Sequence, residues 1–233
     1  MKLCWLGHSG FLLELGGKKI LVDPFIKGNG KFPDNLASEI KDPDYILITH
    51  GHDDHIADAT NLYNSSVTKI ISNAEICSWF FGQAVTNCVF MNIGGSFIEN
   101  DIQFTMVEAL HSSSITSGNQ ILYGGLACGF IIKYKDVSIY HFGDTEIFEN
   151  MKLIEKNHKP NIGLIPIGDR FTMSPGIAAS ACNEYFNFDL VVPMHYGTFP
   201  LITGSPEDFI KHLDKKESAK VLQPGEFIDL GSY

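Results

Sequence analysis

The feature that most constrains this chain is a cluster of ionisable side chains directly after an apolar run. The run, Tyr45-Ile46-Leu47-Ile48-Thr49, is typical of a strand that is buried on both faces. The next residues, His50-Gly51-His52-Asp53-Asp54-His55, bring three imidazoles and two carboxylates to its end. Such groups are costly beside a core unless they are paired, and a divalent metal ion pairs with all of them. These ligand types suit zinc, iron, nickel or manganese, and the absence of cysteine disfavours a closed structural zinc site.

Further ligands are expected at the ends of other strands, because one segment cannot complete two metal sites. His111 follows the extended run 104–110, Asp144 comes shortly after the strand predicted at Val137–His141, and His195 follows the apolar run Leu190–Met194. In α/β folds the chemistry gathers at the carboxyl ends of strands. We therefore expect these three residues to join the cluster.

Composition and charge exclude several classes of protein. The 233 residues are 44% hydrophobic, which is enough for a sizeable core and rules out a disordered chain. The formal net charge of −10, without any long basic run, argues against nucleic acid as a partner. Five cysteines without a CxxC pair predict buried, reduced thiols. Because neither a leader sequence nor an apolar stretch long enough for a membrane helix is found, we expect a cytoplasmic protein without a membrane partner.

The order of the predicted elements indicates one α/β domain spanning residues 1–233. Strands are predicted at Leu3–Leu6, Phe11–Leu15, Lys19–Val22, Tyr45–Thr49, Thr68–Ser72, Val89–Ile93, Gln103–Ala109, Cys128–Tyr134, Val137–His141, Ile162–Pro166 and Leu190–Met194, and near Val221 and Phe227. Helices are predicted at Ile56–Tyr63, Ala74–Phe81, Ile147–Lys156, Pro175–Phe186 and Pro206–Leu213. The segments Lys27–Asp42 and Ser112–Gly125 are expected to be loops that shape a substrate site.

The HxHxDH pattern at 50–55, followed in order by His111, Asp144 and His195, resembles the metallo-β-lactamase superfamily. The flanking strings Trp5–Gly10, Leu21–Phe25, Gly168–Met173 and Pro193–Gly197 are similar to a prokaryotic branch of metal-dependent hydrolases related to the ascorbate-6-phosphate lactonase group. The resemblance implies a four-layer αβ/βα sandwich.

The resemblance also implies a ligand set. His50, His52 and His111 would hold one divalent ion and Asp54, His55 and His195 a second, with Asp144 bridging them. Zinc is the first expectation, and manganese, nickel or iron are alternatives. Two such ions can share a hydroxide that attacks a small ester, lactone, amide or phosphodiester. In this assignment Asp54 and Asp144 are also the catalytic carboxylates.

Three residues near the motif could support the ligands. Asp23 resembles an aspartate that orients a ligand histidine, and it could instead cap the turn at Pro24. His8 could face the site or stabilise its own Gly-His-Ser turn. His141 fits an outer partner of the ligands or a histidine of the core better than it fits a ligand.

Other polar residues are candidates for substrate contacts. Thr172 and the serines after His111 could donate hydrogen bonds to substrate or simply form turns. Arg170, the only arginine, could clamp a phosphate or carboxylate, although a structural ion pair is the simpler expectation. His158 and His212 are predicted to lie on the surface.

Alternative functions remain open at this point. A tRNA-processing-type phosphodiesterase shares the ligand set, but the acidic charge and the lack of a basic arm oppose it. A mononuclear iron dioxygenase is compatible with the spacing, and a non-catalytic scaffold would be expected to have lost ligands. We expect a small-molecule substrate, and the sequence is compatible with an anionic one. It is also compatible with a homo-oligomer.

Overall fold

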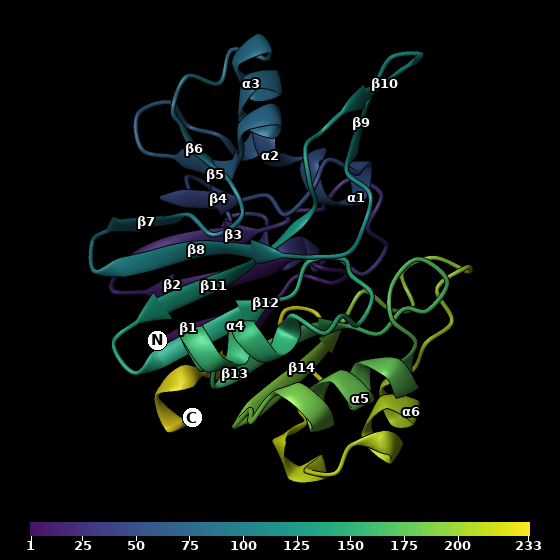
Figure 1. Ribbon diagram of the computed structural model, residues 1–233. Coiled ribbons are helices and arrows are strands. Elements are labelled where there is room, and N and C mark those ends of the chain that lie inside the picture. The colour runs from purple at the N-terminus through teal and green to yellow at the C-terminus, as the bar shows by residue number, and fades with distance from the viewer.

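The computed structural model describes residues 1–233 and shows two β-sheets packed face to face, with helices on the outside (Figure 1). The first sheet has the spatial order β15 (Phe227–Asp229), β1 (Lys2–Trp5), β2 (Phe11–Leu15), β3 (Lys18–Val22), β4 (Tyr45–Leu47), β5 (Lys69–Asn73) and β6 (Cys88–Met91). The second has the order β14 (Leu190–Met194), β13 (Ile162–Pro166), β12 (Val137–His141), β11 (Cys128–Tyr134), β8 (Ile102–Glu108) and β7 (Ser96–Glu99).

Helices cover the outer face of each sheet. The first sheet carries α1 (Asp53–Ile56), α2 (Ala59–Leu62) and α3 (Ala74–Gly82). The second carries α4 (Met151–His158), α5 (Pro175–Tyr185) and α6 (Pro206–His212). Short 3-10 turns lie at Asp34–Leu36, Lys216–Ser218 and Leu230–Ser232. The predicted four-layer αβ/βα sandwich is therefore confirmed.

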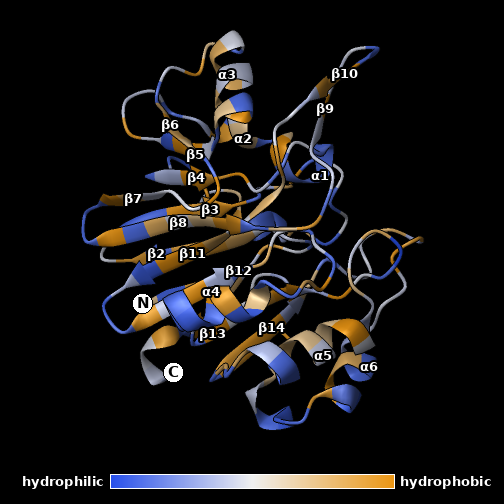
Figure 2. Ribbon diagram, viewed as in Figure 1, coloured by the Kyte–Doolittle hydropathy of each residue, from blue (hydrophilic) through white to orange (hydrophobic).

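Alternation along the strands builds the layers, because successive side chains of a strand point to opposite faces. In β4, Tyr45 and Leu47 join the large core between the sheets, whereas Ile46 packs under the helices of the first sheet. This explains the continuous apolar run, since β4 is buried on both faces. Figure 2 shows the same division, with apolar strands inside and polar helix faces outside. The core between the sheets draws residues from both halves of the chain, which supports the prediction of one domain.

Three of the helices start at side-chain caps. Ser174 and Ser205 accept a hydrogen bond from the backbone N–H three residues on, and each is followed by a proline in the first turn of α5 or α6. Asn73 caps α3 in the same way, from the end of β5. These caps explain why helices begin directly after strands or tight turns here.

The predicted helix Ile56–Tyr63 is wrong, because the segment forms two short helices, α1 and α2, with a break at Asp58. The Asp58 carboxylate accepts hydrogen bonds from the backbone N–H groups of Ile26 and Lys27, at 2.7 and 2.9 Å. These hydrogen bonds join residues that are distant in sequence. They hold the break between α1 and α2 against the loop that follows β3.

Further differences concern strands, among them β7, which the sequence did not predict. The segment Ser112–Gly125, predicted as a loop, contains the hairpin β9 (Ser114–Ser117) and β10 (Gln120–Tyr123), which projects from the body of the molecule (Figure 1). Its turn is Gly118-Asn119, with Gly118 at a positive φ of 59°, as two-residue hairpins require. Conversely, the strand predicted near Val221 is absent, and only an isolated bridge joins Ala219 to Val191.

Candidate metal centre

The histidines and aspartates predicted to be ligands meet at one edge of the sandwich, where strands of both sheets end. His50, His52, Asp54 and His55 come from the turn after β4 and from α1. His111, Asp144 and His195 follow β8, β12 and β14 of the second sheet, respectively. The two sheets thus face each other across this group of side chains.

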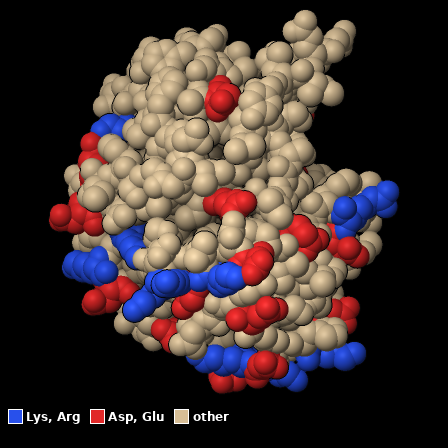
Figure 3. Space-filling model, viewed as in Figure 1, with Lys and Arg blue, Asp and Glu red and all other residues tan.

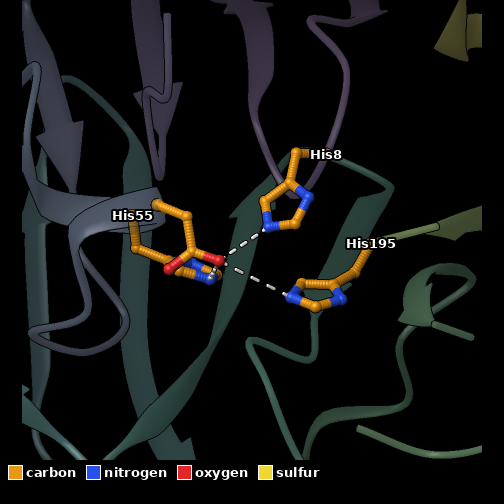
Figure 4. A group of neighbouring side chains, drawn as sticks. His8, His55 and His195 are labelled. Carbon is orange, nitrogen blue, oxygen red and sulfur yellow. Dashed lines mark hydrogen bonds and ion pairs between the residues drawn. The ribbon is translucent and has the colours of Figure 1, made fainter. Parts of the chain in front are cut away.

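The ligand atoms form two neighbouring groups. The first contains His50, His52 and His111, and the second contains Asp54, His55 and His195 together with His8. Within each group, one ligand atom from every residue lies within 4.8 Å of the ligand atoms of the others. Figure 4 shows the rings of His8, His55 and His195 converging from different parts of the chain. A third group, His50, His55 and Asp144, joins the two, so all seven predicted ligands lie together in one cluster.

Asp144 lies between the two groups. Its Oδ2 atom is 3.0 Å from His195 Nε2 and 3.4 Å from His55 Nε2 in the second group. The same atom is 3.7 Å from His111 Nε2 and 4.0 Å from His50 Nε2 in the first group. One carboxylate can therefore reach both groups, as a bridging ligand must.

The donor atoms fit divalent metal ions. His55 Nε2 and Asp144 Oδ1 are buried without a hydrogen-bond partner, although such atoms are costly to leave unpaired. In the first group His50 Nε2 lies only 3.0 Å from His52 Nδ1. Convergent nitrogens and carboxylate oxygens of this kind form the ligand set of zinc and similar ions.

Asp23 controls the tautomers of two of these histidines. Its carboxylate accepts hydrogen bonds from the Thr49 backbone N–H and hydroxyl, at 2.8 and 2.6 Å, and contacts His55 Nδ1 at 2.8 Å. Because the Thr49 hydroxyl donates its proton to Asp23, it can only accept from His50 Nδ1, 3.0 Å away. Both imidazoles thus carry a proton on Nδ1, and their Nε2 atoms are directed toward the site.

The charges of the site follow from burial and from neighbouring groups. Burial lowers the pKa of His50, His52 and His111, with further lowering by adjacent histidines. Burial alone would also lower the pKa of His55, but the carboxylates of Asp144, Asp23 and Asp54 outweigh it and raise that pKa well above the usual value.

Both candidate ligand carboxylates are held in the charged form. Burial by itself would raise the pKa of Asp144, but His195 and His55 outweigh it and hold this pKa well below the usual range. The pKa of Asp54 is likewise lowered, by His55 and His8 against the effect of burial. The first group is therefore a set of neutral imidazoles, and the negative charge is concentrated in the second group and at the bridge.

His8 lies in the second group, which decides between the two roles that the sequence left open. His8 Nε2 is 2.9 Å from Asp54 Oδ2, and Nδ1 is 3.0 Å from the Thr198 hydroxyl. Burial lowers its pKa to about 4, so the ring is neutral near pH 7. Its backbone carbonyl accepts the His195 N–H at 3.0 Å and so ties the two loops together.

Three residues of the site adopt a backbone conformation that is unusual for side chains other than glycine. The φ angles are 54° at His8, 44° at Asp23 and 55° at His195. Such strain persists only where the surroundings hold it, and it is common at functional sites.

The remaining predicted residues lie outside the ligand groups. His141 is buried in the core, where its Nε2–H donates to the Ser9 carbonyl and its Nδ1 accepts from the Gly143 N–H. The hydroxyl of Thr172 is buried without a partner and does not line the pocket over the site. Ser112 does line the pocket, and its hydroxyl lies 3.2 Å from His52 Nε2.

Arg170 forms no ion pair, so the simpler expectation for it was wrong. Its guanidinium group lies 5.9 Å from the centre of the Phe171 ring and does not line the pocket. A turn in which Asp169 and Arg170 both have positive φ angles directs the side chain outward. No sequence pattern predicts this turn, since a positive φ is uncommon for any residue other than glycine and two in succession are rarer still.

The sequence reasoning also missed the aromatic wall of the site. Phe25 and Phe199 pack with ring centres 6.0 Å apart, and both contact the ring of His8. Phe25 directly follows the Asp23-Pro24 pair and Phe199 follows His195 by four positions, so nearness in sequence to predicted ligands was the one available signal.

This fold and this site define a metal-dependent hydrolase. A family model described as "Beta-lactamase superfamily domain" matches residues 2–195. A "UPF0173 metal-dependent hydrolase" of Chelativorans sp. (strain BNC1) is 42% identical over 99% of this chain and 100% of its own length. Another protein of that description, from Methylocella silvestris, is 46% identical over 91% of this chain and 92% of its own. The chain belongs to the UPF0173 metal-dependent hydrolases of the β-lactamase superfamily.

Solved structures support the same assignment. Igni18, described as a novel metallo hydrolase from Ignicoccus hospitalis, has a TM-score of 0.83 and 31% identity, over 97% of both chains. An isothiocyanate hydrolase from Delia radicum gut bacteria shares the fold, with a TM-score of 0.76 over 99% of both chains but only 15% identity. Among the helices of the present structure, none combines the length and hydropathy that crossing a membrane requires.

Proposed function

We propose that this hydrolase uses two divalent metal ions to cleave a small ester, lactone, amide or phosphodiester. The observation that carries the proposal is the position of Asp144, whose one oxygen lies within 4.0 Å of imidazoles in both ligand groups. A site for a single ion would not need a carboxylate between two separate sets of ligands. Zinc is the metal we expect, because all the ligand atoms are imidazole nitrogens or carboxylate oxygens.

In this proposal His50, His52 and His111 would hold one ion and Asp54, His55 and His195 the other, and Asp144 would be shared between the two ligand groups. Bound there, the ions would lower the pKa of a water molecule and polarise the carbonyl or phosphoryl oxygen of the substrate. Asp23 keeps His50 and His55 in the tautomer that leaves Nε2 free. Ser112 lies against His52 Nε2 and so leaves Nδ1 as the free nitrogen of that ring.

The chain's own residues also supply the setting for hydrolysis. Asp54 and Asp144 remain charged near neutral pH, because their pKa values are lowered, and they can balance the charge of cations. The hydroxyl of Ser112 is the only one that lines the pocket, and it contacts His52. In this proposal His52 would carry its proton on Nε2 and donate it to Ser112, so it could not act as a base on that hydroxyl, and a covalent intermediate with the protein is not part of the proposal.

Metal analysis of the purified protein tests this function. We expect two zinc or other divalent ions per chain, and hydrolysis of simple esters or lactones that is lost in chelator and restored by metal. One iron per chain, with oxygen consumption in place of hydrolysis, would favour the dioxygenase alternative. Cleavage of structured RNA, with rates that fall steeply as salt rises, would favour the nuclease alternative.

Little in the structure favours the nuclease. On the face shown in Figure 3, basic and acidic side chains lie intermixed and form no continuous basic surface. We therefore propose a small molecule as substrate. The kinship with the ascorbate-6-phosphate lactonase group and the formation of a homo-oligomer both stay predictions.

A further inference from the structure

The pocket above the metal centre has a polar floor and apolar walls. It encloses about 490 Å³, a volume suited to a small organic molecule. His52, His111, Asp54, Asp144 and His195 form its floor. Four apolar side chains from three separate loops form most of the remaining lining, together with Asp53 and Ser112: Phe25, Phe171, Phe199 and Ile202. A bound molecule would therefore place one end at the candidate metal ligands and the other against the apolar side chains.

Two of these rings expose apolar surface that a bound ligand could cover. Phe171 is 52% exposed and Phe199 is 37% exposed, although both line a concave site. Phe199 is fixed from behind by Phe25 and His8. Exposed aromatic surface in a pocket favours apolar ligands, because burying it releases water from both partners.

Phe171 is held at the pocket by a strained turn. The two residues before it, Asp169 and Arg170, have φ angles of 63° and 56°. The Phe171 N–H donates to the Asp169 carbonyl at 2.5 Å and closes the turn. Two consecutive residues in this conformation are costly, and such strain is commonly kept where it positions a functional side chain.

The pocket offers no cation to a charged substrate group. None of the 17 lysine and arginine side chains lines it, whereas the carboxylates of Asp53 and Asp54 do. Arg170 is near Phe171 but does not line the pocket. An anionic group away from the bond being cleaved would lose water without gaining a partner, which is unfavourable.

We propose that the substrate carries an uncharged, apolar group, an aromatic ring or a short alkyl chain, beside the bond that is hydrolysed. This inference rests on the proposed function, because it takes the ligand groups as the place where the reacting atoms sit. The apolar group lies between Phe171 and Phe199, and a phosphate or carboxylate elsewhere in the molecule is excluded by the lack of a cation.

Binding of hydroxamates to the metal-loaded protein tests this inference without relying on turnover. Acetohydroxamate, benzohydroxamate and 4-carboxybenzohydroxamate share one metal-binding group and differ only in the part that would meet the walls. By calorimetry we expect benzohydroxamate to bind about tenfold more tightly than acetohydroxamate, because its ring buries more apolar area. The added carboxylate should remove most of that advantage.

Single substitutions test which side chains cause the preference for benzohydroxamate. Phe171→Ala and Phe199→Ala should each lower the preference for benzohydroxamate over acetohydroxamate by about threefold. Phe81→Ala is the matched control, because Phe81 is 48% exposed on α3 and lies outside the pocket. It should leave the preference unchanged.

Three outcomes would overturn the inference. Equal binding of acetohydroxamate and benzohydroxamate would reject it while leaving the metal centre intact. Tighter binding of the carboxylated compound, abolished by Arg170→Gln, would show that Arg170 recognises an anionic substrate instead. Failure of the metal-loaded protein to bind acetohydroxamate at all would reject the proposed function, and this inference with it.

Discussion

Asp23 is the residue on which the geometry of the site most depends. Its carboxylate contacts His55 directly and His50 through the Thr49 hydroxyl, and all four residues are fully buried. A single carboxylate in the core thus sets the proton positions of one imidazole in each ligand group. Outer partners of this kind commonly affect metal affinity strongly, although they never touch the ion.

Replacing Asp23 by asparagine should therefore weaken metal binding. The amide would present an N–H in place of an acceptor to His55 or Thr49. At least one ligand imidazole would then no longer be held with its proton on Nδ1. We expect metal affinity to fall by roughly 10- to 100-fold, measured by competition with a chromophoric chelator. Asp101→Asn, in an exposed turn, is the control, and an equal effect of the two substitutions would contradict the role of Asp23.

Asp144 is the residue expected to matter most for activity. Asp144→Ala removes the one carboxylate that reaches both ligand groups, so kcat/KM should fall by more than the roughly 100-fold that outer partners cost. His158→Ala, on α4 and away from the site, should be nearly silent. Rates and metal content measured on both variants check this, and similar losses would show that the ligand assignment is wrong.

At the scale of elements, the site depends on how closely the loops after β13 and β14 approach each other. A Cβ atom at Gly168 would lie 2.2 Å from the His195 carbonyl oxygen and 2.9 Å from His195 Nδ1. Only glycine leaves room for the His195 ring at this point. The Gly168-Asp169 pair therefore helps to position His195, a candidate ligand that lies far away along the chain.

Gly168→Ala should displace His195 and lower both stability and metal content. Overpacking of this kind costs about 1–3 kcal/mol. Gly176→Ala is a matched control in α5, where a Cβ would meet nothing within 4 Å, and it should stabilise the protein by up to about 1 kcal/mol. Urea unfolding and metal analysis of both variants test the prediction, which fails if Gly168→Ala retains full metal content.

At the scale of the whole molecule, His141 joins the two sheets. It lies in β12 of the second sheet, and its Nε2–H donates to the Ser9 carbonyl, between β1 and β2 of the first. Burial lowers its pKa, so the folded protein keeps it neutral. In the unfolded chain the same group titrates near its ordinary value of about 6.5.

The stability of the fold should therefore decrease as pH falls below about 6.5, because the unfolded chain then binds a proton that the folded chain does not. His141→Gln keeps a donor and an acceptor but cannot titrate. In metal-free protein we expect the wild type to lose about 1 kcal/mol more than this variant between pH 7.5 and 5.5. Urea unfolding at the two pH values measures the difference, and equal losses would exclude His141 as the cause.

Local patterns predicted much of the fold, and a long-range contact accounts for the one helix that was wrong. The run before His50 identified a strand buried on both faces, since burial on both faces removes the polar alternation. The single helix predicted at Ile56–Tyr63 failed because Asp58 bonds to the loop after β3. The hairpin in Ser112–Gly125 was missed although Gly118-Asn119 is a turn signal, because β9 is largely polar and each strand is only four residues long.

The sequence by itself indicated a metal-dependent hydrolase and the side chains that would gather at its site, because metal chemistry demands particular side chains and strand ends gather them. The four layers were implied by the resemblance of its motifs to a family. Only the tertiary structure decided that His8 joins the second group, that Arg170 points away, and that three phenylalanines wall the pocket. These features depend on loops that meet from distant parts of the chain. Their relative positions follow from packing of the two sheets, which no local pattern encodes.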